Sequence, residues 1–201
     1  MIDVLAPDRA GLDEAAARLR SGLLVAFPTD TVHGVACRAH DEEALQRLFT
    51  LKGRPPERRV AWLISGLEQC RDLELQIDER AALLAERFWP GPLTLVLPRD
   101  AGDRSTLGVR VPDHATARAI LERTGPLPTS SANPHGFPEC LSTGDVQVAF
   151  AGADLLDAVV DGTSPGGAAS TVLELLPGAA RVVRQGALPR AEIEAVVGPI
   201  D

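Results

Sequence analysis

The chain has 201 residues, of which 45% are hydrophobic and 24% are charged, a composition that excludes a disordered or fibrous protein. Its formal net charge of -8 argues against a broad nucleic-acid-binding surface, because such a surface gains affinity by neutralising phosphates with Lys and Arg. No apolar run approaches the roughly 20 residues of a membrane helix, and the start lacks the layout of a signal peptide. We therefore expect a single cytoplasmic domain over residues 1–201, without membrane association.

Apolar, β-branched runs alternate with helix-patterned stretches along the whole chain. The expected strands lie at residues 23–27, 32–36, 60–64, 93–97, 107–111, 158–160, 171–175 and 181–184. The expected helices lie at residues 12–20, 42–51, 79–88, 115–123, 145–150 and 190–197. Several strands are separated by too little chain for a crossover helix, so the sheet should be mixed. The expected fold class is α/β (α+β).

Polar residues and glycines mark the expected helix ends. Asp41 is placed to N-cap the helix at 42–51, and Gly53 is placed to end it in the left-handed conformation. Asp78 and Thr143 are placed to cap two further helices. The Pro/Gly clusters at 126–138 and 162–167 are typical of ordered loops.

Neither a standard nucleotide fold nor a protein-bound metal is indicated. The strand at 23–27 runs into Pro-Thr-Asp-Thr and not into Gly-x-Gly-x-x-Gly, and no Gly-Lys-Ser/Thr phosphate loop occurs. Cys37, Cys70 and Cys140 form no Cys-x-x-Cys pair, which argues against both a disulfide framework and a zinc site. We expect no metal-ligating residues and reduced cysteines.

The segment at residues 28–34, Pro-Thr-Asp-Thr-Val-His-Gly, places small hydroxyls and a carboxylate between two strands. Its proline stops ladder pairing, and its glycine permits close approach of the backbone. Taken alone, the segment favours a Ser/Thr/Asp turn over a binding site by roughly two to one, since these residues dominate turns.

The segment at residues 52–59, Lys-Gly-Arg-Pro-Pro-Glu-Arg-Arg, carries four basic side chains on a loop that two prolines stiffen. Such a loop can surround a polyphosphate, because Arg binds two phosphate oxygens with a planar fork and Lys acts as a point charge. The alternative is pairing with the negative end of the preceding helix dipole, worth only about 0.3–1 kcal/mol for each charge. A dipole needs one or two such charges, so four favour an anion site. Lys52 is also the only lysine among the 20 basic residues.

Three further segments carry small polar residues next to expected strands. Residues 129–136 are Thr-Ser-Ser-Ala-Asn-Pro-His-Gly, residues 166–171 are Gly-Gly-Ala-Ala-Ser-Thr, and residues 184–186 are Arg-Gln-Gly. Asn supplies a donor and an acceptor together, and Ser hydroxyls can bond a phosphate or a carboxylate. No one of these segments is specific by itself.

Together the segments resemble the YrdC-like family, the threonylcarbamoyl-AMP synthases that begin threonylcarbamoyladenosine modification of tRNA. The matching motifs follow the family order over about residues 21–186. They are Pro-Thr-Asp-Thr-Val-x-Gly at 28–34, Lys-x-Arg-Pro at 52–55, Trp-Pro-Gly-Pro-Leu-Thr at 89–94, Val-Arg-Val-Pro at 109–112, Ser-Ala-Asn at 131–133, Ser-Thr-Val at 170–172 and Arg-x-Gly at 184–186. Each motif is weak, whereas seven in order are a specific signal.

The resemblance implies a twisted mixed sheet flanked by helices, with a deep cleft that holds ATP, L-threonine and bicarbonate. In the family, a threonine carbamate attacks the α-phosphate of ATP and gives threonylcarbamoyl-AMP and pyrophosphate. The positions implied to contact threonine are Thr31, His33, Arg110, Ser131 and Ser170. The positions implied to contact ATP are Lys52, Arg54, Arg58, Thr106, Asn133, Ser142 and Arg184.

We expect catalysis by alignment of the substrates and by charge stabilisation from Lys52, Arg54 and the Mg²⁺ that accompanies ATP. The implied partner is a downstream threonylcarbamoyl transferase that modifies tRNA, and direct tRNA binding should be weak or absent. His33 stands where the family usually has Tyr, and Leu63 stands where many members have His. Both departures lie on the threonine side of the implied cleft.

Two other functions are open at this point. A YrdC-like paralogue that binds nucleotide for another carbamoyl transfer would share the cleft, and the lack of an appended domain speaks against it. A non-catalytic RNA-binding module is the second, and the charge of -8 and the 3% aromatic content weigh against that reading.

Overall fold

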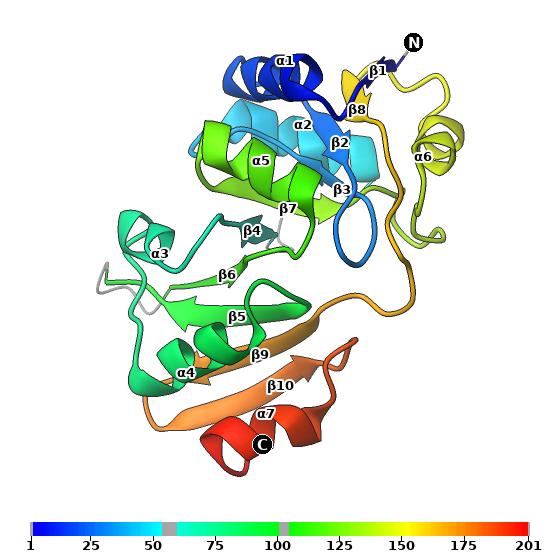
Figure 1. Ribbon diagram of the computed structural model, residues 1–201. Coiled ribbons are helices and arrows are strands. Elements are labelled where there is room, and N and C mark those ends of the chain that lie inside the picture. Colours follow the sequence, from blue (N-terminus) through cyan, green and yellow to red (C-terminus); the bar gives the residue numbers. More distant parts are fainter. Residues whose placement is uncertain (1, 54–59, 101–104, 201) are drawn as a thin grey trace.

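The computed structural model describes residues 2–53, 60–100 and 105–200, and its elements are labelled in Figure 1. Within these residues the strands are β1 (Asp3–Leu5), β2 (Val25–Phe27), β3 (Gly34–Ala36), β4 (Ala61–Leu63), β5 (Leu93–Pro98), β6 (Thr106–Arg110), β7 (Leu127–Ser131), β8 (Ala158–Val160), β9 (Thr171–Leu176) and β10 (Ala179–Arg184). The helices are α1 (Arg9–Arg20), α2 (Glu42–Lys52), α3 (Gln69–Asp72), α4 (Glu79–Phe88), α5 (Ala115–Thr124), α6 (Thr143–Ala149) and α7 (Arg190–Val197).

The strands form one sheet in the order β1-β8-β2-β3-β7-β4-β6-β5-β9-β10. The pairs β1–β8, β2–β8, β4–β6 and β5–β9 are parallel, and the remaining pairs are antiparallel. The expected mixed sheet flanked by helices is therefore confirmed. In the described part of the chain, every helix is too short or too polar to span a membrane.

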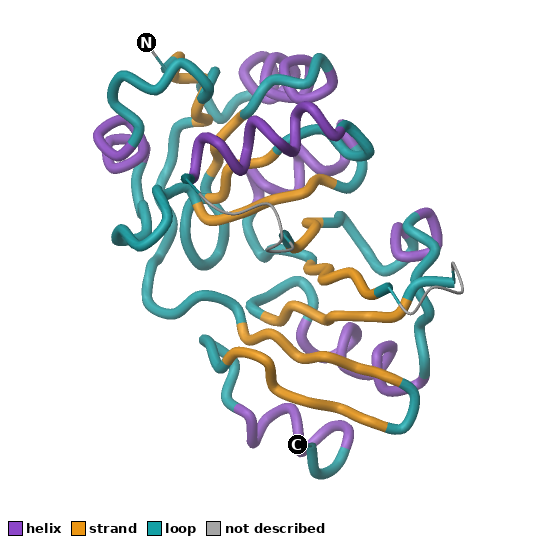
Figure 2. Tube along the Cα trace, turned by 180° about the vertical axis from the view of Figure 1, so that it is seen from behind, coloured by secondary structure: helices purple, strands orange, loops and turns teal. Residues whose placement is uncertain are grey.

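Alternating side chains of the strands β1 to β3 and β8 pack against helices on both faces of the sheet. Val25 and Phe27 of β2 pack with α1 and α5, whereas Ala26, between them, packs with α2 and α6. Figure 1 shows α1 and α5 in front of these strands and α2 behind them, and Figure 2, from the opposite side, brings α2 forward. This part of the sheet is thus an inner layer.

The strands β5 and β9 carry helices α4 and α7 over one face only. Leu93, Leu95 and Leu97 of β5 form a core with Leu84 of α4 and Ile193 of α7. The intervening residues of β5 point to the opposite face, where the candidate site lies.

Each strand and helix expected from the sequence is present, with ends that agree or are shifted by at most three residues. The sequence missed three elements: the short β1 at the sheet edge, the four-residue α3, and β7. Residues 126–138 were expected to be a loop, but β7 (residues 127–131) is a central strand between β3 and β4. Proline usually marks an edge or a loop because it cannot donate to a ladder. Pro128 has no N–H to donate, but its carbonyl still takes part in the pairing with β3 by accepting the Cys37 N–H at 3.1 Å.

Two of the expected helix caps are confirmed and one is wrong. Asp41 and Asp78 accept hydrogen bonds from the backbone N–H groups three residues later, as expected. Thr143, however, is the first residue of α6, and Ser142 is its N-cap. The Ser142 hydroxyl accepts from Asp145 N at 3.1 Å, and the Asp145 carboxylate accepts from Ser142 N at 2.9 Å. This reciprocal pair is a capping box, and it outcompetes a cap one residue later.

We predict that Ser142→Ala lowers the melting temperature by about 2–4 °C, because loss of an N-cap costs about 1 kcal/mol and the chain is near 200 residues. Ser142→Asp is the matched control, since aspartate also caps helices, and it should keep the melting temperature of the wild type. Thermal unfolding followed by circular dichroism measures both. Equal melting temperatures for the wild type and Ser142→Ala would contradict the capping role.

His33 is a fully buried polar residue in the turn between β2 and β3. Its Nδ1 atom lies 3.0 Å from the Ser164 hydroxyl, and among the described residues its Nε2 atom has no hydrogen-bond partner. Burial, with a smaller contribution from the nearby His114, lowers the pKa of His33 from 6.5 to about 4. The imidazole is therefore neutral at neutral pH.

We predict that His33 makes the protein less stable as pH falls from about 6.5 to about 4. In this window the unfolded chain binds a proton at His33 that the folded chain does not, so the free energy of unfolding falls with pH by up to about 1.4 kcal/mol per unit. Urea unfolding at pH 7.5 and pH 5 should show a smaller loss for His33→Gln than for the wild type. His135→Gln, at an exposed position, should lose as much as the wild type; the same loss in all three proteins would refute the assignment.

Candidate active site

A cavity of about 390 Å³ lies against the sheet face opposite α4 and α7. Strands β3, β4, β5, β6, β7, β9 and β10 all contribute to its wall, together with the segment 29–34 and Glu139. Its polar and charged lining residues are Thr29, Thr31, His33, Thr94, Thr106, Arg110, Thr129, Ser130, Ser131, Glu139, Ser170 and Arg184. The cavity therefore collects residues from six of the seven motifs that carry the resemblance, all but the motif at 52–55.

The floor of the cavity follows from strand alternation. Thr94 and Val96 of β5 line the cavity, whereas Leu93, Leu95 and Leu97 are buried in the core on the other face. In the neighbouring β6, Gly108 and Arg110 line the cavity and Val109 is in the core. Ala61 and Gly108, which lie in the parallel pair β4–β6, are the small residues that leave room at the centre.

Gly34 lies at the entrance of β3, where a side chain of the neighbouring strand approaches closely. A Cβ atom at this position would lie 2.9 Å from the Cγ2 atom of Thr129 on β7. Real Cβ contacts essentially never come below 3.0 Å, so the Thr129 side chain would have to shift for any other residue to fit. The glycine that ends the motif at 28–34 therefore has a packing role.

Arg110 is the central cation of the cavity and is only 6% exposed. Its Nη2 atom lies 2.5 Å from the Asp30 carboxylate, its Nη1 atom donates to the Thr31 hydroxyl at 3.0 Å, and its Nε atom donates to the Gly91 carbonyl at 2.9 Å. Both side chains of the ion pair are nearly buried. A buried guanidinium needs such partners, and here they also fix its plane.

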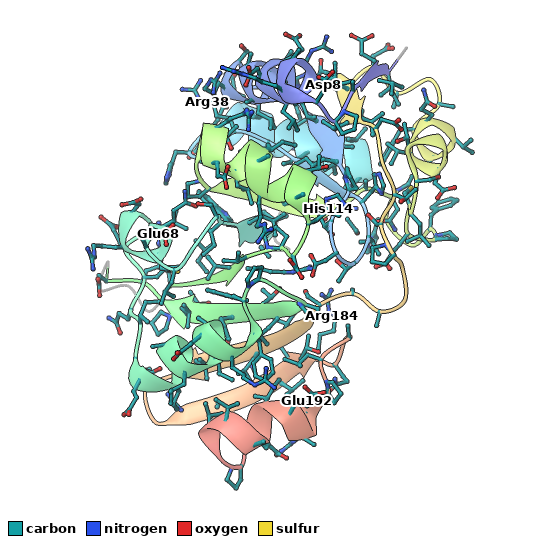
Figure 3. The ribbon with its side chains drawn as sticks, in the orientation of Figure 1. Asp8, Arg38, Glu68, His114, Arg184 and Glu192 are labelled. Atoms are coloured by element: carbon teal, nitrogen blue, oxygen red, sulfur yellow. The ribbon has the colours of Figure 1, made fainter. Side chains whose placement is uncertain are left out.

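A second polar cluster lies where β5, β9 and β10 meet. The hydroxyls of Thr94 and Ser170 lie 2.8 Å apart, and both side chains are buried. Arg184, labelled in Figure 3, stands at the end of β10 and donates to the Ser170 carbonyl at 2.8 Å. Burial lowers the pKa of Arg184, and Glu139 opposes this shift while Arg110 adds to it. The guanidinium groups of Arg110 and Arg184 therefore line the same cavity, and this arrangement favours an anionic ligand.

Lys52 reaches the edge of this site from the last turn of α2. It is only 4% exposed, and its ammonium donates to the carbonyls of Ser131 and Asn133, the latter at 2.6 Å. The Asn133 side-chain amide donates to the Phe137 carbonyl at 2.6 Å. Lys52 therefore organises the turn after β7 in addition to carrying charge.

The structure brings most of the expected site residues together. Thr31, His33, Thr106, Arg110, Ser131, Ser170 and Arg184 line the cavity. Lys52 and Asn133 lie behind Ser131, and Ser142 caps α6 without lining the cavity. Arg54 and Arg58 lie outside the described residues.

Sequence reasoning gave no individual role to Asp30 or to five polar residues of the cavity wall, which are Thr29, Thr94, Thr129, Ser130 and Glu139. Asp30 lies between Thr29 and Thr31 in the motif at 28–34. A carboxylate within a binding motif could have been predicted to pair with a buried arginine. Thr94 ends the motif at 89–94, and its place opposite Ser170 follows only from the parallel pairing of β5 with β9. Glu139, an exposed residue that lines the cavity, has no signal in the sequence.

The described residues contain no group of three or more His, Cys, Asp or Glu side chains that could hold a metal ion. Cys37, Cys70 and Cys140 are buried free thiols, and burial raises the pKa of Cys37 and Cys70 to about 12 and that of Cys140 to about 11. These protonated thiols are poor nucleophiles and poor metal ligands.

The chain is similar to known proteins over most of its length. A family model for Sua5, YciO and YrdC, described as "Telomere recombination", matches residues 17–186. A threonylcarbamoyl-AMP synthase of Pyrococcus abyssi is 40% identical over 195 residues, which is 92% of this chain and 57% of that protein. A threonylcarbamoyl-AMP synthase of Pseudomonas syringae is 33% identical over 87% of this chain and 97% of its own length.

The structure also resembles a solved relative with a bound amino acid. The crystal structure of Pyrococcus abyssi Sua5 complexed with L-threonine matches with a TM-score of 0.89 and 38% identity, over 100% of this chain and 62% of that one. The chain thus spans less than two thirds of the length of the Pyrococcus abyssi relatives. With the family model covering most of its residues, the chain belongs to the Sua5/YciO/YrdC family.

Proposed function

We propose that this protein is an L-threonylcarbamoyladenylate synthase, which forms threonylcarbamoyl-AMP and pyrophosphate from L-threonine, bicarbonate and ATP. The observation that carries the proposal is a single cavity that holds two arginines beside several hydroxyls in the fold of this family. Threonine is a zwitterion and ATP is a polyanion, so their common site needs both kinds of group. Relatives of known name carry this activity.

Arg110 is suited to the threonine carboxylate. Three of its five N–H groups are used by Asp30, Thr31 and Gly91, which leaves two donors in a fixed plane. Ser131 and Ser170 lie on either side of the cavity wall and offer hydroxyls for the amino acid. We assign these residues, with Thr31 and His33, to the threonine side.

The reaction requires a nucleophile made from threonine itself. The threonine amine adds to bicarbonate with loss of water, and an oxygen of the resulting carbamate attacks the α-phosphorus of ATP, from which pyrophosphate departs. Arg184, Thr106 and Asn133 are assigned to ATP, with Lys52 placed to stabilise charge on the phosphates. This chain's contribution is to align the two substrates and to offset their negative charges.

Mg²⁺ is proposed to enter as part of the ATP substrate. The carboxylates that line or border the cavity do not make a metal site of their own, because Asp30 is committed to Arg110 and Glu139 stands alone. The described residues hold no group of three or more His, Cys, Asp or Glu side chains placed to bind an ion.

The product is proposed to pass to a separate threonylcarbamoyl transferase that modifies tRNA, in the cytoplasm. The net charge of -8 disfavours strong binding of a polyanion, so tRNA should bind weakly or not at all. The aromatic content of only 3% also disfavours the RNA-binding module, because such modules stack bases on aromatic side chains. A carbamoyl-transfer paralogue is distinguished by its choice of substrate.

The proposal is tested by incubating the purified protein with ATP, bicarbonate and one amino acid at a time. We predict that pyrophosphate release is fastest with threonine, slower with serine and slowest with valine. Valine has nearly the shape of threonine but lacks its hydroxyl. A pocket with buried polar partners for that hydroxyl rejects valine, because valine leaves them unpaired, whereas an apolar pocket cannot distinguish the two amino acids. Equal turnover of valine and threonine, or no dependence on any amino acid, would refute the function; mass spectrometry identifies the adenylate.

We predict that Lys52→Ala lowers pyrophosphate release by about 100-fold or more, the effect of removing one charge-stabilising donor. Because Lys52 is buried and holds two carbonyls, the same change should also lower the melting temperature. Arg47→Ala is the matched control on the same helix. It loses an ion pair with Asp157 at 3.4 Å, so its stability should fall while its turnover at 25 °C stays near that of the wild type. Similar turnover in both variants would contradict the role of Lys52.

A further inference from the structure

Ser164 lies in the segment between β8 and β9 and is 6% exposed. It is not one of the described residues that line the cavity. Its hydroxyl oxygen accepts the Thr29 backbone N–H at 3.1 Å and lies 3.0 Å from His33 Nδ1. One buried hydroxyl therefore joins both ends of the segment 29–33, which supplies the threonine side of the proposed site.

Two backbone hydrogen bonds strengthen this junction. The Ser164 N–H donates to the Leu141 carbonyl at 2.8 Å, and the Gly166 N–H donates to the Thr31 carbonyl at 2.9 Å. The segment 161–170 is thus attached to the segment after β7 and to the segment after β2. Among the described residues, Ser164 is the only member of segment 161–170 whose side chain forms hydrogen bonds with residues 29–33.

A continuous set of hydrogen bonds leads from Ser164 to Arg110. The Thr29 hydroxyl donates to the Val32 carbonyl at 2.7 Å, so its one proton is used. The Thr31 hydroxyl, 3.1 Å away, must then donate to Thr29 and can accept from Arg110 Nη1 at 3.0 Å. The position of Thr29 therefore sets the direction of the Thr31 hydroxyl and, with it, one donor of Arg110.

We propose that Ser164 is a positioning residue for the amino-acid subsite, acting through Thr29 and His33 on Thr31 and Arg110. The inference rests on the proposed function. Ser164 touches neither the phosphates nor the reacting atoms in this assignment, so its removal should weaken the binding of threonine while ATP binding and the chemical step stay intact. His33, which stands in place of an aromatic residue of the family, is held in its orientation by the same hydroxyl.

The chain offers a matched control for loosening of the whole segment. Thr143 attaches the start of segment 161–170 through its hydroxyl, which donates to the Asp161 carboxylate at 2.8 Å and accepts from the Gly162 N–H at 3.1 Å. Among the described residues, Thr143 forms no hydrogen bond with residues 29–33, and its partner Gly162 lies two residues before Ser164. Thr143→Ala therefore removes these two hydrogen bonds to segment 161–170 and leaves the Ser164 hydroxyl in place.

The experiment measures KM for threonine, KM for ATP and kcat for the wild type, Ser164→Ala and Thr143→Ala. We expect Ser164→Ala to raise the threonine KM about tenfold, with ATP KM and kcat within about twofold of the wild type. Thr143→Ala should change all three constants less than about twofold, although both variants should melt earlier. If Ser164→Ala does not fold, Ser164→Cys gives the same comparison, because a thiol keeps the packing and is a weaker hydrogen-bonding group.

The outcomes separate this inference from the function on which it rests. A wild type that releases no pyrophosphate with threonine refutes the proposed function. In an active wild type, equal changes of threonine KM in Ser164→Ala and Thr143→Ala overturn the positioning role alone, as does an equal rise of both KM values in Ser164→Ala. A selective rise of threonine KM, matched by weaker threonine binding in titration calorimetry, supports it.

Discussion

The ion pair between Arg110 and Asp30 is the interaction on which the candidate site depends. An arginine on the inner face of a sheet is stable only where its charge and its N–H groups find partners. Asp30 supplies the charge, and to do so the segment after β2 must turn back over the sheet. That turn brings Thr29, Thr31 and His33 to the wall of the same cavity. Neutralisation of one buried cation therefore determines the position of a whole motif.

Periodicity predicted most of the fold because most strands obey a simple rule. In β5 the leucines alternate with Thr94 and Val96, and the structure places the two sets on opposite faces as the alternation requires. β7 was not predicted because its sequence, Leu-Pro-Thr-Ser-Ser, is typical of a loop. It becomes a strand because β3 and β4 offer unpaired edges on either side, a tertiary constraint that local sequence does not carry.

The site shows the same division between local and long-range information. Arg110, Ser131 and Ser170 were found by their motifs, but what each of them contacts depends on strand pairing across the chain. Lys52 illustrates the difference: its sequence neighbours predicted a basic loop, whereas the structure places it in the last turn of α2 and buries it against the turn after β7. The pairing of Ser164 with His33, 131 positions apart in sequence, has no local signature at all.

The central place of β7 also bears on how the molecule is built during synthesis. β7 joins β3 to β4, and β9 joins β5 to β10, so neighbours in the sheet come from distant parts of the chain. Non-local pairing of this kind is slow, since loop entropy is lost before the contacts form. A nascent chain that ends before β7 cannot connect the strands on which the cavity rests. Gly34, the last residue of the motif at 28–34, pairs locally with Phe27 of β2, but its partner on the other side, Ser131 of β7, is made only after more than half of the polypeptide.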